Sequence, residues 1–251
     1  MKIIDTNAIL GYVAGKTEPQ HTVEDLIQKM DASGVDAAVA YHSRSSIQVM
    51  PGNDDMQKIA EASQNRIKAC WVLHPYLDGV QMPKADDLMA LLKKKRPAAV
   101  RLIPKEHRYL LNDFYCDDLF AILDELRIPV LLNFRADVYY PLETLPKVTE
   151  EHPNIPFVLT DVCHKNSVLT WNLLRKRKNV YFPVGYMCGT GELDQLVNVF
   201  GADHFLFGSS DGNNHSGALG LVYQGRFSQE KKESIFSGNW ERLQEDIRWV
   251  L

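Results

Sequence analysis

The chain has 251 residues, of which 45% are hydrophobic and 24% are charged, and its formal net charge is −4. These values are typical of a globular protein, and a pI near 6.1 excludes the strongly basic surface that nucleic-acid binding requires. No apolar run approaches the ~20 residues of a membrane-spanning helix, so we expect neither nucleic acid nor a membrane as a partner.

The cysteines and the first residues indicate where the protein works. Cys70, Cys116, Cys163 and Cys188 are widely spaced, and no Cys-x-x-Cys pair predicts a zinc cluster or a disulfide framework. Reduced thiols favour a cytoplasmic location. An apolar run begins at once, which leaves no room for a signal peptide.

The first eleven residues, MKIIDTNAILG, predict a strand over residues 2–7 that ends in polar side chains. Alternation along an extended chain puts Asp5, Asn7 and Ile9 on one face. Asp and Asn also stabilise turns by local hydrogen bonds, so a turn is the alternative.

Helices and strands alternate along the rest of the chain. Residues 12–20 read as a loop, and Thr22 with Asp25 predicts a capping box for a helix that stops at Gly34. Asn53 is expected to cap a second helix that runs through Ala60. The further helices are predicted over residues 85–95, 117–127, 142–151, 167–178 and 192–200. The further strands are predicted over residues 35–41, 67–73, 98–103, 128–132, 156–160, 180–184 and 204–207.

Eight strands separated by helices predict a parallel sheet with helical crossovers, and eight such units close into a (β/α)8 TIM barrel. An open, doubly wound sheet is the alternative, but no Gly-rich phosphate-binding motif follows any strand. We expect one domain over residues 1–251, without a boundary. Two extra C-terminal helices, 229–236 and 240–250, are expected to cover the exterior of the barrel.

The C-terminal ends of barrel strands are where active sites are built. The polar residues at these ends are predicted to form one ring. Such a ring alone does not indicate function, because any soluble barrel is expected to have one polar end. The members of the ring are Asp5, Asn7, His42, His74, Arg101, Asn133, Arg135, Asp161, His164, Ser209, Ser210 and Asp211.

A polar rim does not explain Arg101, because this residue lies within a strand, between Val100 and Leu102. A buried guanidinium needs a carboxylate partner or an anionic ligand. An internal ion pair with Asp5 is one interpretation. Binding of a small anionic molecule is the other, since arginine holds carboxylates with two parallel hydrogen bonds.

The eight histidines divide into two groups. His42 and His74 end strands at the correct edge, and His164 follows Asp161 in a loop that could fold over the site. Four others are expected to be at the surface or structural; they are His21, His107, His152 and His204. His215 is given no role.

The chain resembles the amidohydrolase-related branch of the amidohydrolase superfamily, from Lys2 to about Leu243. The resemblance rests on the order and spacing of five short segments. They are Ile3-Ile4-Asp5-x-Asn7-x-Ile9-x-Gly11, Ala99-Val100-Arg101-Leu102-Ile103-Pro104, Ile128-Pro129-Val130-Leu131-Leu132-Asn133, Phe200-Gly201-Ala202-Asp203 leading into Phe205-Leu206-Phe207-Gly208-Ser209, and Ser237-Gly238-Asn239.

The superfamily's metal ligands do not carry over onto this sequence. Two histidines of the first strand correspond to Asn7 and Ile9, and those of the fifth and sixth strands to Asn133 and Asp161. The aspartate of the eighth strand corresponds to Ser210, with Asp211 one residue later. Isoleucine cannot bind a metal and neutral amides are poor zinc ligands, so we expect no metal and no cofactor. An oxygen-ligand site for a hard cation at Asp5, Asp161 and Asp211 is a weaker alternative.

Two functions follow from the resemblance. The first is a metal-independent, lactonase-like hydrolase of a small carboxylated substrate. Asp211 or Asp161 would be its base and His164 or His74 its acid. Arg101 and Arg135 would hold the carboxylate, while Asn7 and Asn133 would stabilise the oxyanion.

The second function is a pseudoenzyme that binds a small ligand or a protein partner without turnover. The loss of several metal ligands favours it, whereas the polar replacements and Arg101 speak against it. A homo-oligomer that pairs through the C-terminal helices, with Trp240 and Trp249 as apolar contacts, is left open.

Overall fold

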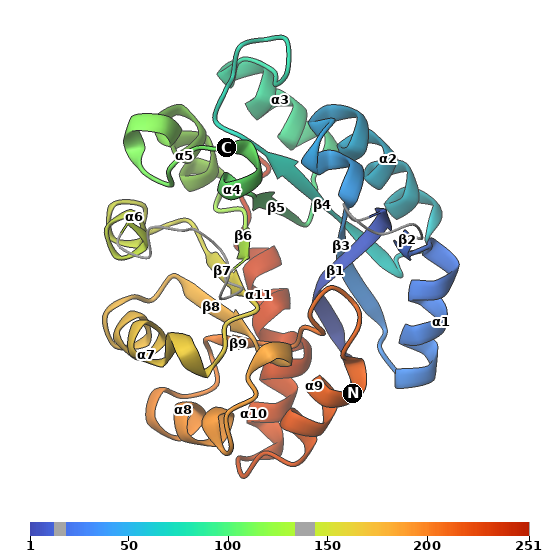
Figure 1. The fold of residues 1–251 in the computed structure, drawn as a ribbon, viewed down its shortest axis with the longest axis vertical. Coiled ribbons are helices and arrows are strands. Elements are labelled where there is room, and N and C mark those ends of the chain that lie inside the picture. The colour runs from blue at the N-terminus through green and yellow to red at the C-terminus, as the bar shows by residue number, and fades with distance from the viewer. Residues whose placement is uncertain (13–18, 134–143, 251) are drawn as a thin grey trace.

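The structure, a computed structural model, describes residues 1–12, 19–133 and 144–250. Eight parallel strands form a nearly closed barrel with helices alternating around it, which confirms the predicted TIM barrel (Figure 1). A short antiparallel strand, β2, lies beside β1. The strands are β1 (Ile4–Tyr12), β2 (Pro19–His21), β3 (Ala37–His42), β4 (Ile67–Leu73), β5 (Ala99–Leu102), β6 (Val130–Asn133), β7 (Phe157–Thr160), β8 (Val180–Pro183) and β9 (Phe205–Leu206).

The helices surround the strands in chain order, as the colour gradient of Figure 1 shows. They are α1 (Val23–Ser33), α2 (Val49–Ala62), α3 (Ala85–Lys95), α4 (Pro104–His107), α5 (Asp113–Leu126), α6 (Leu145–Glu151), α7 (Ser167–Lys176), α8 (Glu192–Phe200), α9 (His215–Tyr223), α10 (Gln229–Glu233) and α11 (Asn239–Glu245). A π-helical turn, Ser234–Gly238, joins the last two. In the described part of the chain no helix is both long and apolar enough to cross a membrane.

The ring of strands closes where the end of β9 returns to β1. The Thr6 amide donates to the Phe207 carbonyl at 3.0 Å, and Ala8 pairs with Asp211 in an isolated parallel bridge. The Phe207 amide in turn donates to the Ile235 carbonyl of the π-helical turn at 2.8 Å. A π turn shifts the helical hydrogen-bond register. Here the Ile235 carbonyl of the turn accepts a hydrogen bond from the segment that follows β9.

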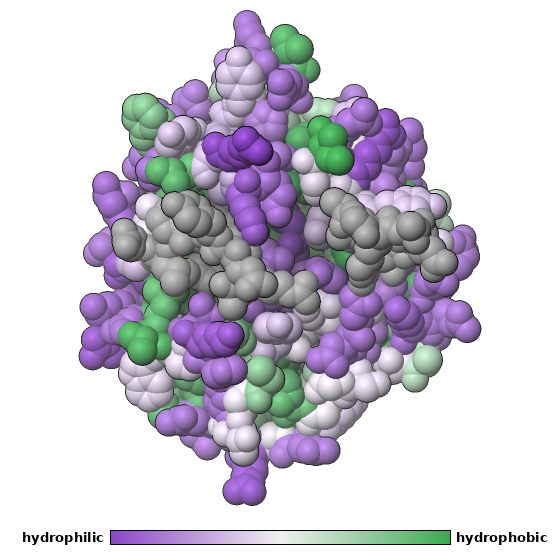
Figure 2. Space-filling view, viewed as in Figure 1, coloured by the Kyte–Doolittle hydropathy of each residue, from purple (hydrophilic) through white to green (hydrophobic). Residues whose placement is uncertain are grey.

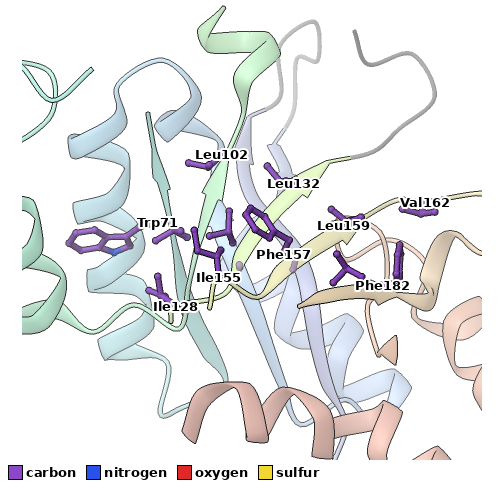
Figure 3. Packing of buried hydrophobic residues seen from close by; sticks show 14 of the residues in the cluster. Trp71, Leu102, Ile128, Leu132, Ile155, Phe157, Leu159, Val162 and Phe182 are labelled. Atoms are coloured by element: carbon purple, nitrogen blue, oxygen red, sulfur yellow. The ribbon is translucent and has the colours of Figure 1, made fainter. Parts of the chain in front are cut away.

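Most of the apolar core lies between the strands and the surrounding helices. Figure 3 shows this layer with Trp71, Leu102, Ile128 and Phe157 among its members. Figure 2 shows mostly hydrophilic residues over the outer surface in this view, with hydrophobic ones scattered.

A second apolar cluster fills the base of the barrel interior. The strands contribute the inward-facing side chains of Ile4, Val39, Cys70, Ala99, Leu131, Val158 and Leu206. Trp240 and Leu243 of α11 pack against this layer. The expectation that the last helix covers the barrel exterior is therefore wrong for α11, which closes the N-terminal end. Trp240 is buried there and offers no surface for pairing with a second copy.

Several predicted elements have different bounds in the structure. The helix assigned to an Asn53 cap begins earlier, as α2 at Val49, because Pro51 is tolerated in a first turn. Asn53 is instead buried within α2, where its side chain exchanges two 2.8 Å hydrogen bonds with the Val72 backbone of β4. Residues 12–20, expected as a loop, include the start of β2, and α4 and α9 were not predicted.

Candidate active site

Three buried polar side chains form a hydrogen-bonded chain at the C-terminal mouth of the barrel. Arg101 Nη2 of β5 donates to Asn7 Oδ1 of β1 at 2.5 Å. Asn7 Nδ2 donates to Asp161 Oδ1, just after β7, at 3.4 Å. Ala99 belongs to the interior base layer. Arg101 follows it by two residues on the same strand, so its side chain also points into the barrel interior. One amide therefore connects a buried cation to a buried carboxylate.

The rest of the guanidinium contacts aromatic and neutral groups. Its central carbon lies 4.4 Å from the centroid of the Tyr41 ring, and burial raises the pKa of that phenol. Below it, burial raises the pKa of the Cys70 thiol to about 12, which keeps this neighbour neutral. Arg101 Nε has no hydrogen-bond partner among the described residues.

The ion pair once considered between Arg101 and Asp5 is not formed, because Asp5 is fully occupied elsewhere. Its Oδ1 accepts from the Asn7 and Ser209 amides at 3.0 Å each. Its Oδ2 accepts from the Ser209 hydroxyl and from His215 Nε2, the latter at 3.0 Å. Four donors use the acceptor capacity of a carboxylate. Asp5, predicted to bind substrate, instead joins β1 to the segment after β9.

Three residues at the same end of the barrel have a left-handed backbone conformation. Asp161, Ser210 and Asp211 have positive φ angles of 60°, 55° and 61°. Each such residue costs about 1–3 kcal/mol and occurs preferentially at functional sites. Asp161 Oδ2 is buried and has no partner among the described residues. Asn7 thus holds one oxygen of this carboxylate, and the other accepts no hydrogen bond from the described residues.

His21 and Lys29 hold the backbone of Asp211. His21 Nε2 lies 3.1 Å from the Asp211 carbonyl oxygen, and Lys29 Nζ lies 3.2 Å from His21 Nδ1. Burial, with Lys29 second, lowers the pKa of His21. The neutral ring therefore donates from Nε2 to the carbonyl and accepts from Lys29 at Nδ1. The assignment of His21 as surface or structural missed this contact with the predicted site.

The remaining predicted residues take no part in the Arg101–Asn7–Asp161 hydrogen bonds. Asn133 is half-buried at the end of β6, in register with Thr160. His164 is exposed, and its Nδ1 lies 3.8 Å from the Sγ of Cys188. His42 Nδ1 accepts from the Arg44 amide at 3.1 Å. Arg135 lies outside the described residues.

His74 also takes no part in these hydrogen bonds, and its ring is in an edge-to-face contact with His107 at a centroid distance of 5.3 Å. Burial lowers the pKa of His74 to about 4. The ring is therefore uncharged at neutral pH.

Sequence reasoning missed several contacts of these site residues. The inward orientation of Tyr41 could have been predicted, since Tyr41 lies two residues after the interior Val39 at the end of a predicted strand. His215 gave no signal, because no element was predicted where α9 lies and its partner Asp5 is 210 residues away.

The described side chains do not form the zinc site that the resemblance implies for a member of the superfamily. In residues 1–12, 19–133 and 144–250, no group of three or more His, Cys, Asp or Glu side chains could hold a metal ion. Asp5 has no free acceptor, and Asn7 is engaged on both sides. These residues do not fit such a site, and we derive no catalytic step through a metal.

Comparison with known proteins places the fold. No protein-family model and no curated protein matches the sequence. An uncharacterised TIM-barrel protein from Bordetella bronchiseptica is 18% identical, with a TM-score of 0.74 over 98% of this chain and 99% of that one. The 4-oxalomesaconate hydratase of Rhodopseudomonas palustris is 17% identical, with a TM-score of 0.69 over 97% and 96%.

A third similar structure is the 5-carboxyvanillate decarboxylase of Sphingomonas paucimobilis. It is 12% identical, with a TM-score of 0.72 over 97% of this chain and 99% of that one. At these identities the likeness is one of fold. The chain therefore has, over nearly its whole length, the TIM-barrel fold of these enzymes.

Proposed function

We propose that the chain is a metal-independent member of the amidohydrolase-related branch that hydrolyses a small carboxylated substrate at the C-terminal mouth of its barrel. One observation carries the proposal: a buried guanidinium whose Nε has no partner among the described residues. A fully buried cation is costly without a compensating anion. Asp161 and Asp211 attract the Arg101 guanidinium, and a substrate carboxylate would supply an anion in direct contact with it.

Asp161 is the best-supported general base. Asn7 fixes its Oδ1, and its Oδ2 is buried without a described partner. In a lactone, Asp161 Oδ2 would take a proton from water as the water oxygen attacks the carbonyl carbon. The ring C–O bond then breaks, and the proton passes to the departing alkoxide, giving a hydroxy acid.

The remaining roles follow from position. The second N–H of the Asn7 amide and the amide of Asn133 would donate to the oxyanion. Asp211, held by His21, is the alternative base. Two similar enzymes are named for carboxylated compounds, 5-carboxyvanillate and 4-oxalomesaconate, which supports a carboxylated substrate. Hydrolysis as the reaction is our proposal.

The test is a screen of lactones with and without a carboxylate substituent, read by acid release. We expect Asp161→Asn to lower kcat ~10²–10⁴-fold, the usual contribution of a general base. Arg101→Met should weaken transition-state binding by ~1.5–3 kcal/mol for the carboxylated compounds only, since it removes charged hydrogen bonds. Asp118→Asn, on the exposed face of α5, is the matched control and should leave kcat and kcat/KM unchanged.

Other outcomes of this test exclude the proposal or support its alternative. Hydrolysis that Asp161→Asn and Arg101→Met leave intact would exclude the proposed roles. Binding of a carboxylated lactone that depends on Arg101, without turnover, would support the pseudoenzyme.

A further inference from the structure

A separate cavity of about 520 Å³ opens beside the barrel mouth, between the segment that follows β4 and the start of α5. Residues 74–76 and Gln81 form one wall, and residues 107–109 with 114–115 form the other. Its volume lies within the ~300–1,000 Å³ of small-molecule sites. It shares none of the Asn7–Arg101–Asp161 contacts.

Planar rings make up most of the cavity wall. Two imidazoles, three phenols and a phenyl ring line it, and they belong to His74, His107, Tyr76, Tyr109, Tyr115 and Phe114. Phe114 is 86% exposed and Tyr76 is 62% exposed, so much aromatic surface faces solvent. Rings pack on other rings in stacked or edge-to-face contacts that stabilise a complex beyond the effect of the buried area. This wall favours a flat ligand.

Hydrogen bonds fix which nitrogen of each imidazole carries the proton. His74 Nδ1 accepts from the Tyr76 amide at 3.1 Å, so its Nε2 is a donor. His107 Nε2 lies 3.2 Å from the Ser46 carbonyl oxygen and must donate to it. Burial lowers the pKa of both rings, with His107 as a further cause for His74, so both are neutral.

Among the residues that the structure describes, Arg108 is the one formal charge that lines the cavity at neutral pH. Two acidic groups lie nearby but do not line it. Asp78 Oδ1 accepts from the Val80 and Gln81 amides at 2.9 and 2.8 Å, and Glu106 is exposed on α4. The wall therefore presents a cation and the His74 Nε2–H donor, without a lining carboxylate. That combination complements an anion.

We propose that this cavity binds a planar aromatic carboxylate, with the ring against Tyr76, Phe114 and Tyr115 and the carboxylate against Arg108 and His74 Nε2. The site is independent of the proposed hydrolase, because Arg101 and Asp161 take no part in it. The aromatic side chains favour a flat ring, and Arg108 with His74 Nε2 favours a negative charge.

Benzoate is the probe. Cyclohexanecarboxylate keeps the charge without the flat ring, and benzamide keeps the ring without the charge. Binding is read from the imidazole NMR signals of His74 and His107, assigned with His74→Gln and His107→Gln. We expect benzoate to shift both signals saturably. Benzamide should bind roughly tenfold or more weakly, because it loses a charged hydrogen bond, and cyclohexanecarboxylate roughly two- to tenfold more weakly, because it loses the packing of ring on ring.

Arg108→Gln has a matched control in Arg96→Gln. Both arginines are exposed and follow a helix in the left-handed conformation, with φ of 56° and 51°. Arg108→Gln should weaken benzoate binding roughly tenfold or more, while Arg96→Gln and Arg101→Met leave it unchanged.

Three results would overturn the proposal. They are no shift of either imidazole signal, equal binding of benzamide, and binding insensitive to Arg108→Gln. Benzoate binding lost in Arg101→Met but kept in Arg108→Gln would locate it in the barrel mouth. That result would refute this site and support the proposed function.

Discussion

Histidine protonation couples single residues of this barrel to pH. The pKa values of His21, His42, His74 and His107 are all lowered, in each case chiefly by burial. A folded state that keeps these rings neutral binds fewer protons than the unfolded chain once the pH falls below the ordinary histidine value of about 6.5. Unfolding then takes up protons, so acid destabilises the fold.

His74 gives the sharpest prediction of this kind, because its folded pKa is about 4. Its contribution to stability is complete above pH ~6.5 and is lost as the pH falls towards 4, with a limiting slope of ~1.4 kcal/mol per pH unit. We expect the wild-type free energy of unfolding, from urea titrations at pH 7 and pH 5, to fall by at least ~1 kcal/mol.

His74→Gln should reduce this difference between the two pH values, and His164→Gln, at an exposed position, should leave it unchanged. Equal pH dependence in wild type and His74→Gln would show that His74 is protonated alike in both states.

The sequence predicts well which residues lie at the C-terminal mouth of the barrel. It predicts less well which of these residues contact one another. Asn7, Arg101 and Asp161 follow from strand ends and from the cost of a buried guanidinium, and they are in contact. The partner of Arg101 could not be read in advance, because Asp5 is saturated by Ser209 and His215, more than 200 residues away.

Among the elements, agreement is best where the pattern is local. β4 and α3 have the predicted bounds, 67–73 and 85–95, and the Thr22–Asp25 capping box is present. The start of α2 failed because Asn53, a good cap by type, bonds to a strand 19 residues away. Tertiary partners of this kind leave no periodic signal.

The ends of β8 and β9 approach so closely that only glycine fits between them. A Cβ at Gly185 would lie 2.0 Å from the Gly208 carbonyl oxygen. We expect Gly185→Ala to destabilise the protein by several kcal/mol or to prevent folding, because backbone must move. Thermal unfolding and soluble yield measure the effect.

Gly220→Ala in α9 is the control, since no atom lies within 4 Å of its Cβ position. It should stabilise the protein by ~0.4–1 kcal/mol, as alanine favours helices over glycine. A harmless Gly185→Ala would mean that the two strand ends separate readily.

At the scale of the molecule, the barrel has a polar end and an apolar end of different construction. Strand ends and loops form the mouth, whereas α11 closes the base with Trp240 and Leu243. Gln244 Nε2 adds a 2.9 Å hydrogen bond to the Ala98 carbonyl just before β5. The sequence predicted a last helix, but the surface expected for it, the barrel exterior, was wrong for α11.

Trp240→Ala should cost ~3–5 kcal/mol, the usual range for an aromatic removed from a core, because Trp240 is only 3% exposed. Trp171→Ala on α7 is the control; it loses an edge-to-face contact with Phe200 at the surface, worth ~0.5–1.5 kcal/mol. Urea unfolding compares the two. Similar losses would show that α11 is not needed to seal the base.

The saturated carboxylate of Asp5 also bears on how the chain folds. Its bonds to Ser209 and His215 close loops of 204 and 210 residues. The entropy of loop closure grows with length, and contacts so distant in sequence slow folding. The last step of assembly is therefore expected to be the docking of the segment after β9 onto β1. Until then most of that edge of the first strand is unpaired, since β2 pairs only with Gly11 and Tyr12, and the nascent barrel is an open, curved sheet that another chain could extend.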